Sequence, residues 1–318
     1  MEATKVEKQI KNSHPFIAPK SYPWLIICDG KHRDRQIFYD ISNNRYDKKS
    51  IPEMCNKLIY ACSHGWLVLV DSNSKDCCLW NPISLEKVQL PRLESIDYNI
   101  CTLSSSPSDP ECHILFFHRQ KDSLLVCQLG DLEFNKQENF VFGNEHYTLW
   151  NVTVVGKTIY CMTYPPRYSL VRVEFVGPKV EFTRLIMEEF LWPSPPDMQH
   201  FTGFLVECCG ELFLVHMMYF GLIMEEVYGF LVFRMDFAKK RWVRLKSIGE
   251  HTIFVCEHHR TCCMYSLAKE LGIKSNSIYY TREQDRFLYV FDMENLSVSK
   301  WLPCPIVSRD SVLYWAMI

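Results

Sequence analysis

The side chains best suited to bind a metal ion in this sequence are Cys256, His258, His259, Cys262 and Cys263. Thiolate sulfur and imidazole nitrogen are ligands that Zn²⁺ prefers, and these five lie within eight residues. Their spacing matches no standard zinc module. The apolar run 253–255 precedes them, which indicates a strand that passes into a loop. We therefore assign no metal site and expect no cofactor.

Two further patterns could indicate catalysis. Residues 156–158 (GKT) copy the end of a phosphate-binding loop, but Asn151 stands where the first glycine belongs, and the apolar run that follows is typical of a strand. A hairpin turn explains this segment better. His64 beside Gly65 could act as a base, yet no Gly-x-Ser-x-Gly nucleophile motif accompanies it. We therefore predict no catalytic residues and a protein that is not an enzyme.

The amino-acid composition argues against a nucleic-acid partner and against a disulfide-bonded protein. The 318 residues are 47% apolar, and 35 basic side chains nearly balance 37 acidic ones, so there is no strong field for nucleic-acid phosphates. The fifteen cysteines are odd in number and many lie in apolar runs, such as Cys28, Cys127, Cys161 and Cys208. This pattern predicts free, buried thiols rather than a disulfide framework.

No membrane or targeting segment is evident. The longest apolar run, 212–224, contains His216 and is shorter than the roughly 18 to 20 residues of a membrane helix, so we interpret it as parts of two strands. The first residues carry acids early and have no apolar core, unlike a secretory signal. We expect a soluble intracellular protein with no membrane partner, cytoplasmic or nuclear, and leave organellar import open.

The chain repeats one pattern of short strands. Segment 63–71 (SHGWLVLVD), the run 79–82 (LWNP) and the closing run 88–91 (VQLP) form one unit. Similar units contain an aromatic residue or Met followed by Asp at 39–40, 235–236 and 291–292. Helical periods are nearly absent, so we predict an all-β protein.

The spacing of the repeats predicts a propeller. Strands of this type end near residues 40, 81, 129, 174, 236 and 292, which gives spacings of about 41 to 62 residues, the range of four-stranded blades with variable loops. We predict a single β-propeller of about six four-stranded blades, with seven as an alternative. We expect residues 1–20 to be a short, flexible N-terminal extension and residues 21–318 to be the propeller domain.

The first unit lacks one strand. The C-terminal segment 311–318 (SVLYWAMI) could supply it, which would close the ring and leave no open sheet edge. Tryptophans 66, 80, 242 and 301 occupy matching strand positions, and we expect them to pack between blades and to be largely buried.

Four of these segments carry a family resemblance. The runs 63–68, 80–82, 204–212 and 235–243 follow one another as in a large plant family that has a KIB-type β-propeller, formerly a domain of unknown function, usually behind an F-box. The resemblance covers roughly residues 20 to 315. It implies a propeller that binds a partner protein, because members with the F-box are regarded as substrate receptors of cullin-based ubiquitin ligases.

An F-box is a helical module of about 40 to 50 residues, and only some 21 residues precede Pro23. We therefore expect no F-box and no association with the ubiquitin-ligase linker. The predicted function is a noncatalytic protein-interaction propeller that competes for, or regulates, an unknown protein partner. The alternative is an enzyme or small-ligand-binding propeller that uses its central channel.

The proline-rich segment 190–197 (FLWPSPPD) is the best candidate for a partner contact. A rigid loop that carries Phe190, Trp192 and Pro193 suits protein recognition, since aromatic residues often dominate binding energy. The alternative is that Trp192 folds back over a blade.

Overall fold

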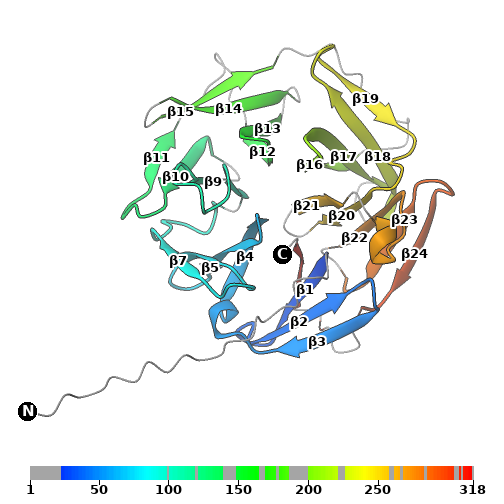
Figure 1. Cartoon of the computed structure of the whole chain (residues 1–318), viewed down its shortest axis with the longest axis horizontal. Helices are drawn as coiled ribbons and strands as arrows, with labels where there is room; N and C mark the ends of the chain where they lie inside the picture. The colour runs from blue at the N-terminus through cyan, green and yellow to red at the C-terminus, as the bar shows by residue number, and fades with distance from the viewer. Residues whose placement is uncertain are drawn as a thin grey trace, which may run out of the picture.

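The chain folds into a ring of β-sheets. The computed structural model describes residues 23–98, 100–118, 121–138, 148–164, 169–176, 179–185, 200–220, 226–257, 261–265, 268–282, 285–303, 308 and 311–316. Within these residues, six sheets stand like blades around a common centre (Figure 1). The prediction of an all-β, six-bladed propeller is confirmed. No helix in the described ranges is long and apolar enough to cross a membrane.

Blades 1 to 3 each have four strands. From the inside outward, blade 1 contains β25 (Val312–Ala316), β1 (Trp24–Asp29), β2 (Arg35–Asp40) and β3 (Arg45–Lys49). Blade 2 contains β4 (Lys57–Ser63), β5 (Trp66–Asp71), β6 (Cys77–Trp80) and β7 (Lys87–Leu90). Blade 3 contains β8 (Ile100–Leu103), β9 (His113–Phe117), β10 (Ser123–Gln128) and β11 (Asn135–Glu138).

Blades 4 and 5 have the same plan, and blade 6 is larger. Blade 4 contains β12 (Thr148–Val155), β13 (Thr158–Tyr164), β14 (Leu170–Val176) and β15 (Lys179–Arg184). Blade 5 contains β16 (His200–Cys208), β17 (Glu211–Phe220), β18 (Glu226–Asp236) and β19 (Arg241–Leu245). Blade 6 contains β21 (Thr261–Tyr265), β20 (Thr252–Cys256), β22 (Ser277–Thr281), β23 (Leu288–Asp292) and β24 (Ser297–Trp301). Two short 3₁₀ helices, η1 (Pro52–Met54) and η2 (Ala268–Leu271), lie in connections.

The fifth strand of blade 6 differs from the sequence-based expectation. We had placed the Cys/His-rich segment in a loop, whereas Cys263 lies in β21, opposite Phe254 of β20. Strand β20 then pairs in parallel with β22, with Phe254 opposite Tyr279. The residues of β21 include Thr, Met and Tyr, which fit a strand, but five residues rich in cysteine give too short a pattern to distinguish a strand from a loop.

The C-terminal strand closes the ring, as predicted. Strand β25 pairs antiparallel with β1, placing Trp315 opposite Leu25 and Leu313 opposite Ile27. The indole Nε1 of Trp315 also donates a hydrogen bond to the carbonyl of Val255 in blade 6, at 3.2 Å. Its ring lies 4.9 Å from that of Phe254. The last strand therefore joins blade 1 to blade 6 by backbone pairing, side-chain packing and a hydrogen bond.

The core consists of six apolar clusters, each between two neighbouring blades. One cluster joins blades 3 and 4 through residues such as Phe117 and Val173, and another joins blades 5 and 6 through residues such as Val215 and Ile278. The other four clusters join the remaining neighbours. Because each inner strand buries one face toward each neighbouring blade, its side chains form a nearly continuous apolar run, whereas outer strands such as β3 and β11 are polar and exposed.

The four tryptophans lie in these interfaces, as predicted, but their burial differs. Trp80 is fully buried between blades 1 and 2. Trp66, Trp242 and Trp301 pack against three other clusters and stay partly exposed. Trp301 donates an Nε1–H bond to the Tyr39 hydroxyl across the blade 6–blade 1 interface, at 3.1 Å. The expected burial is complete for Trp80 and partial for the other three, which keep some contact with solvent.

The recurring Asp or Asn has a local structural role. Its side-chain oxygen accepts backbone N–H groups two or three residues further on, which holds the turn after the strand. This occurs in turns that begin at Asp40, Asp71, Asn81, Asp236 and Asp292. The repeat that we recognised in the sequence thus marks strand-to-strand turns.

The free cysteines are mainly core residues. Cys28, Cys127, Cys161 and Cys208 form no disulfide, and all four are buried. The prediction of free, buried thiols is confirmed for these four.

Replacing Trp315 with Ala should cost about 3–5 kcal/mol in unfolding free energy, because it empties a buried site at the ring closure. Trp315 is only 4% exposed, whereas Leu132 is 92% exposed. Leu132→Ala is therefore the control and should change stability by no more than about 0.5 kcal/mol. Urea unfolding curves of both variants test this, and equal, small effects would contradict the role of β25 in closure.

Replacing Asp292 with Asn should destabilise the fold in a pH-dependent way. The Lys274 ammonium, 2.6 Å away, and the N–H of Glu294 hold the pKa of Asp292 well below its usual value. The carboxylate therefore stabilises the folded state above the unfolded pKa of about 3.9 and loses this effect as pH falls further. Melting temperatures of wild type and D292N should differ at pH 7, begin to converge below about pH 4, and meet only as the pH falls to the strongly lowered pKa of the folded state. A difference that stays constant with pH would rule out the carboxylate as its source.

Candidate functional site

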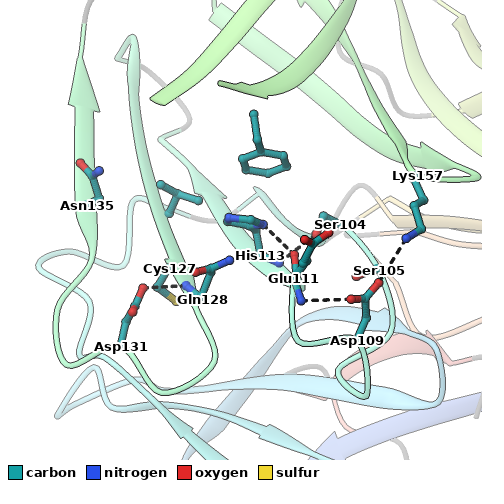
Figure 2. A pocket seen from close by; sticks show the side chains of 12 residues that line it. Ser104, Ser105, Asp109, Glu111, His113, Cys127, Gln128, Asp131, Asn135 and Lys157 are labelled. Atoms are coloured by element: carbon teal, nitrogen blue, oxygen red, sulfur yellow. Dashed lines mark hydrogen bonds and ion pairs between the residues drawn. The ribbon is translucent and has the colours of Figure 1, made fainter. Parts of the chain in front are cut away.

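A concave site lies between blades 3 and 4. It has a volume of about 590 Å³ and is formed by the loop 104–112, the β10–β11 turn, the β12–β13 turn and the end of β14 (Figure 2). Its lining residues are Ser104, Ser105, Asp109, Glu111, His113, Val126, Cys127, Gln128, Asp131, Asn135, Lys157 and Phe175. We call this site the blade 3–4 pocket.

The loop 104–112 is held by its own hydrogen bonds. The Ser104 N–H donates to the His113 carbonyl at 2.9 Å, and the His113 N–H donates to Ser104 Oγ at 2.8 Å. In the middle of the loop, Asp109 Oδ1 accepts the Glu111 N–H at 3.0 Å, and the buried Cys112 thiol donates to the Ser105 carbonyl at 3.2 Å. These bonds fix the loop as a rigid wall of the pocket.

An aromatic stack joins the two blades within the pocket. The rings of His113 in blade 3 and Phe175 in blade 4 lie 4.0 Å apart with an angle of 20° between their planes. The Nδ1 atom of His113 is 2.8 Å from the Glu111 carbonyl, which accepts a hydrogen bond from it and fixes the ring orientation. The pocket therefore has a preformed, flat apolar surface beside polar groups.

An ion pair crosses the pocket edge. Lys157, in the turn after β12, places Nζ 3.5 Å from Asp109 Oδ2, as Figure 2 shows. The pKa of Asp109 is lowered, mainly by the hydrogen bond from the Glu111 N–H and further by Lys157. The turn has Gly156 at φ +63° and joins paired strands at Val155 and Thr158. The sequence-based prediction of a hairpin turn, rather than a phosphate loop, is confirmed.

Acidic groups dominate the pocket mouth. Asp109, Glu111 and Asp131 are three carboxyl groups, and the lining contains one lysine, Lys157. Asp131 Oδ2 accepts the Gln128 N–H at 2.8 Å, so this carboxylate is also held in place. The negative charge at the mouth of the pocket favours a ligand that carries Lys or Arg side chains.

The pocket lining suits binding better than nucleophilic chemistry. Cys127 is its potential nucleophile, but burial raises the pKa of this thiol, so it stays protonated at neutral pH. His113, the neighbouring imidazole in the lining, has one nitrogen bonded to a backbone carbonyl and its ring stacked on Phe175. The described groups therefore offer shape, charge and an aromatic surface.

The structure describes only some of the residues that the sequence analysis singled out. Phe190, Trp192 and Pro193 lie outside the described residues, as do His258 and His259. His64 is an exposed turn residue with φ +53°. The buried Cys256 thiol donates to the Leu313 carbonyl at 3.0 Å.

Sequence reasoning missed most of the blade 3–4 pocket. Lys157 is the lining residue that the sequence analysis discussed, as part of a run that resembles the end of a phosphate-binding loop. The other side chains come from separate turns, and no spacing between them signals that they meet. The Pro- and Ser-rich stretch 104–110 (SSSPSDP) marked a loop between strands without indicating its role.

The described residues form a β-propeller in which turns from neighbouring blades surround one concave pocket. The chain belongs to the KIB1-4 β-propeller family, whose sequence profile matches residues 38–300. The resemblance inferred from the four motifs is confirmed.

Two relatives are F-box proteins of Arabidopsis thaliana. The F-box/kelch-repeat protein At1g57790 is 22% identical over 284 residues, which cover 85% of this chain and 74% of that protein. The F-box protein At3g56470 is 20% identical over 309 residues, which cover 92% of this chain and 79% of that protein. Among solved structures, dihydro-heme d1 dehydrogenase NirN aligns with a TM-score of 0.41 and 9% identity, over 91% of this chain and 55% of that chain. This low structural likeness carries no argument about activity.

Replacing Lys157 with Ala should leave stability almost unchanged. Its side chain is 82% exposed and that of Asp109 is 27% exposed, so water screens their attraction. The expected change in unfolding free energy is less than about 0.5 kcal/mol, measured by urea titration. A loss several times larger would mean that this ion pair holds blades 3 and 4 together.

Proposed function

We propose that this protein is a noncatalytic interaction propeller that binds a basic segment of a partner protein in the blade 3–4 pocket. The observation that carries the proposal is the rigid acidic mouth beside the His113–Phe175 stack. A preorganised site of this kind costs little ordering entropy on binding. Lysine or arginine side chains of the partner would meet the carboxylates, and their stems would lie on the aromatic surface.

The sequence similarity to F-box proteins supports a role in the recognition of a target protein. In this proposal the propeller recognises a target protein, as substrate-binding domains do, and the 318-residue chain competes with F-box-bearing relatives for that target. It would thereby regulate the access of those relatives to the target. Cytoplasmic or nuclear residence belongs to the same proposal.

The segment that contains Phe190, Trp192 and Pro193 remains a proposed second contact. Its aromatic side chains would add hot-spot contacts to the charged pocket. Trp192→Ala should reduce partner recovery while far-UV circular dichroism stays unchanged. Full recovery with an intact fold would remove this segment from the binding surface.

Charge reversal at the pocket tests the proposal. The tagged 318-residue chain is purified from Arabidopsis cells, and its partners are quantified by mass spectrometry. The double variant Glu111→Lys with Asp131→Asn changes the charge of the mouth, while Asn still offers an oxygen to the Gln128 N–H. Recovery of the specific partner should fall at least about tenfold, a loss of about 1.4 kcal/mol in binding.

The control for this experiment is Glu270→Lys, because Glu270 is an exposed residue of η2 in blade 6, away from the pocket. It should retain full recovery. Equal recovery with the pocket variant would show that partners bind elsewhere. The same purification should contain no ubiquitin-ligase linker, and strong linker recovery would overturn the competitor role.

A further inference from the structure

A cluster of two cysteines and a histidine lies at the interface of blades 5 and 6. Cys208 ends β16, and Cys209 with Gly210 forms the turn to β17, with φ values of +53° and +79°. The Sγ atoms of Cys208 and Cys209 are 3.8 Å apart. His251, directly before β20 of the next blade, brings a ring nitrogen into the cluster, and the three potential ligand atoms all lie within 4.8 Å of one another.

Hydrogen bonds fix the ring orientation and the backbone of His251. Its Nδ1 is 2.8 Å from the Ile248 carbonyl, so this nitrogen carries the proton and the lone pair is on Nε2. Metal-binding histidines commonly have this arrangement, in which a carbonyl fixes the tautomer and ring direction. The backbone is fixed as well, since the His251 carbonyl accepts the Asn276 N–H at 2.9 Å and the His251 N–H donates to Ile248.

We propose that Cys208, Cys209 and His251 bind one Zn²⁺ ion, with the fourth position open to water or to a partner side chain. Two thiolates on a tetrahedral zinc, each about 2.3 Å from the metal, are about 3.8 Å apart. The observed sulfur separation already has this value. Binding releases the two thiol protons to solvent, and the ion is bound by two thiolates and one neutral imidazole.

The surroundings permit access and provide charge balance. Cys209 is exposed and His251 is partly exposed, so an ion can enter from solvent, whereas Cys208 is buried. The Glu207 carboxylate accepts the Gly210 N–H at 2.8 Å, which holds the turn and leaves a negative charge nearby. The soft sulfur ligands favour Zn²⁺ over Mg²⁺ or Ca²⁺, which prefer oxygen.

Such an ion would cross-link two blades. Cys208 and Cys209 belong to blade 5, and His251 leads into blade 6, so the ion would add a bridge to an interface that has apolar packing and a Tyr219–Glu257 hydrogen bond. The site is separate from the blade 3–4 pocket. Its failure would therefore leave the proposed partner-binding function untouched.

The test is zinc binding by the purified 318-residue protein under reducing conditions. Metal is removed with a chelator, Zn²⁺ is returned, and the bound zinc is counted by mass spectrometry and titrated against a competing chelator. We expect one zinc per chain, a higher melting temperature with zinc, and, for Co²⁺, the absorption bands of tetrahedral thiolate coordination. Mg²⁺ should not displace the zinc.

Three variants decide whether these residues are the ligands. Cys209→Ser and His251→Gln replace exposed or partly exposed side chains and should fold, and each should weaken zinc binding by at least about 100-fold. Cys55→Ser, which changes a partly exposed cysteine outside the cluster, should bind zinc as the wild type does. The proposal is overturned if the wild type takes up no zinc, or if both ligand variants retain wild-type affinity.

Discussion

Each blade of this propeller depends on its two neighbours to bury its faces. The six apolar clusters all lie between adjacent blades, so no sheet is buried within a single repeat. The stabilisation from apolar burial is therefore distributed around the ring of blades. If the ring were open, the two blades at the gap would each expose an apolar sheet face to water. The pairing of β25 with β1 prevents this, because the first and the last described strands share one blade.

The same geometry produces the candidate binding sites. Where two blades meet, turns that are far apart in the sequence lie next to each other, on a base that packing holds rigid. The blade 3–4 pocket combines the loop 104–112 with Lys157 and Phe175, and the cysteine–histidine cluster combines the β16–β17 turn with His251. Sequence variation in these turns can change a site without disturbing the clusters beneath it.

The sequence predicted the parts of the fold that repeat. Apolar runs of strand length, the Asp or Asn that holds the following turn and the unpaired first unit together predicted six blades and closure by the C-terminal strand. Strand β21 was missed because its five residues give no period. Strand position also did not separate the fully buried Trp80 from the partly exposed Trp66, Trp242 and Trp301. The pocket and the cysteine–histidine cluster were missed for another reason. Each site joins residues of two neighbouring blades that are far apart in the sequence, so no local spacing indicates that they meet.

Native-state hydrogen exchange measured by NMR or mass spectrometry tests the central claim, that the closed ring is one cooperative unit, most directly. If closure by β25 links the blades, the amides of β25 and β1 should exchange as slowly as those of inner strands such as β16, and should become exposed in the same unfolding event. Fast, independent exchange of β25 while the other inner strands stay protected would contradict the account.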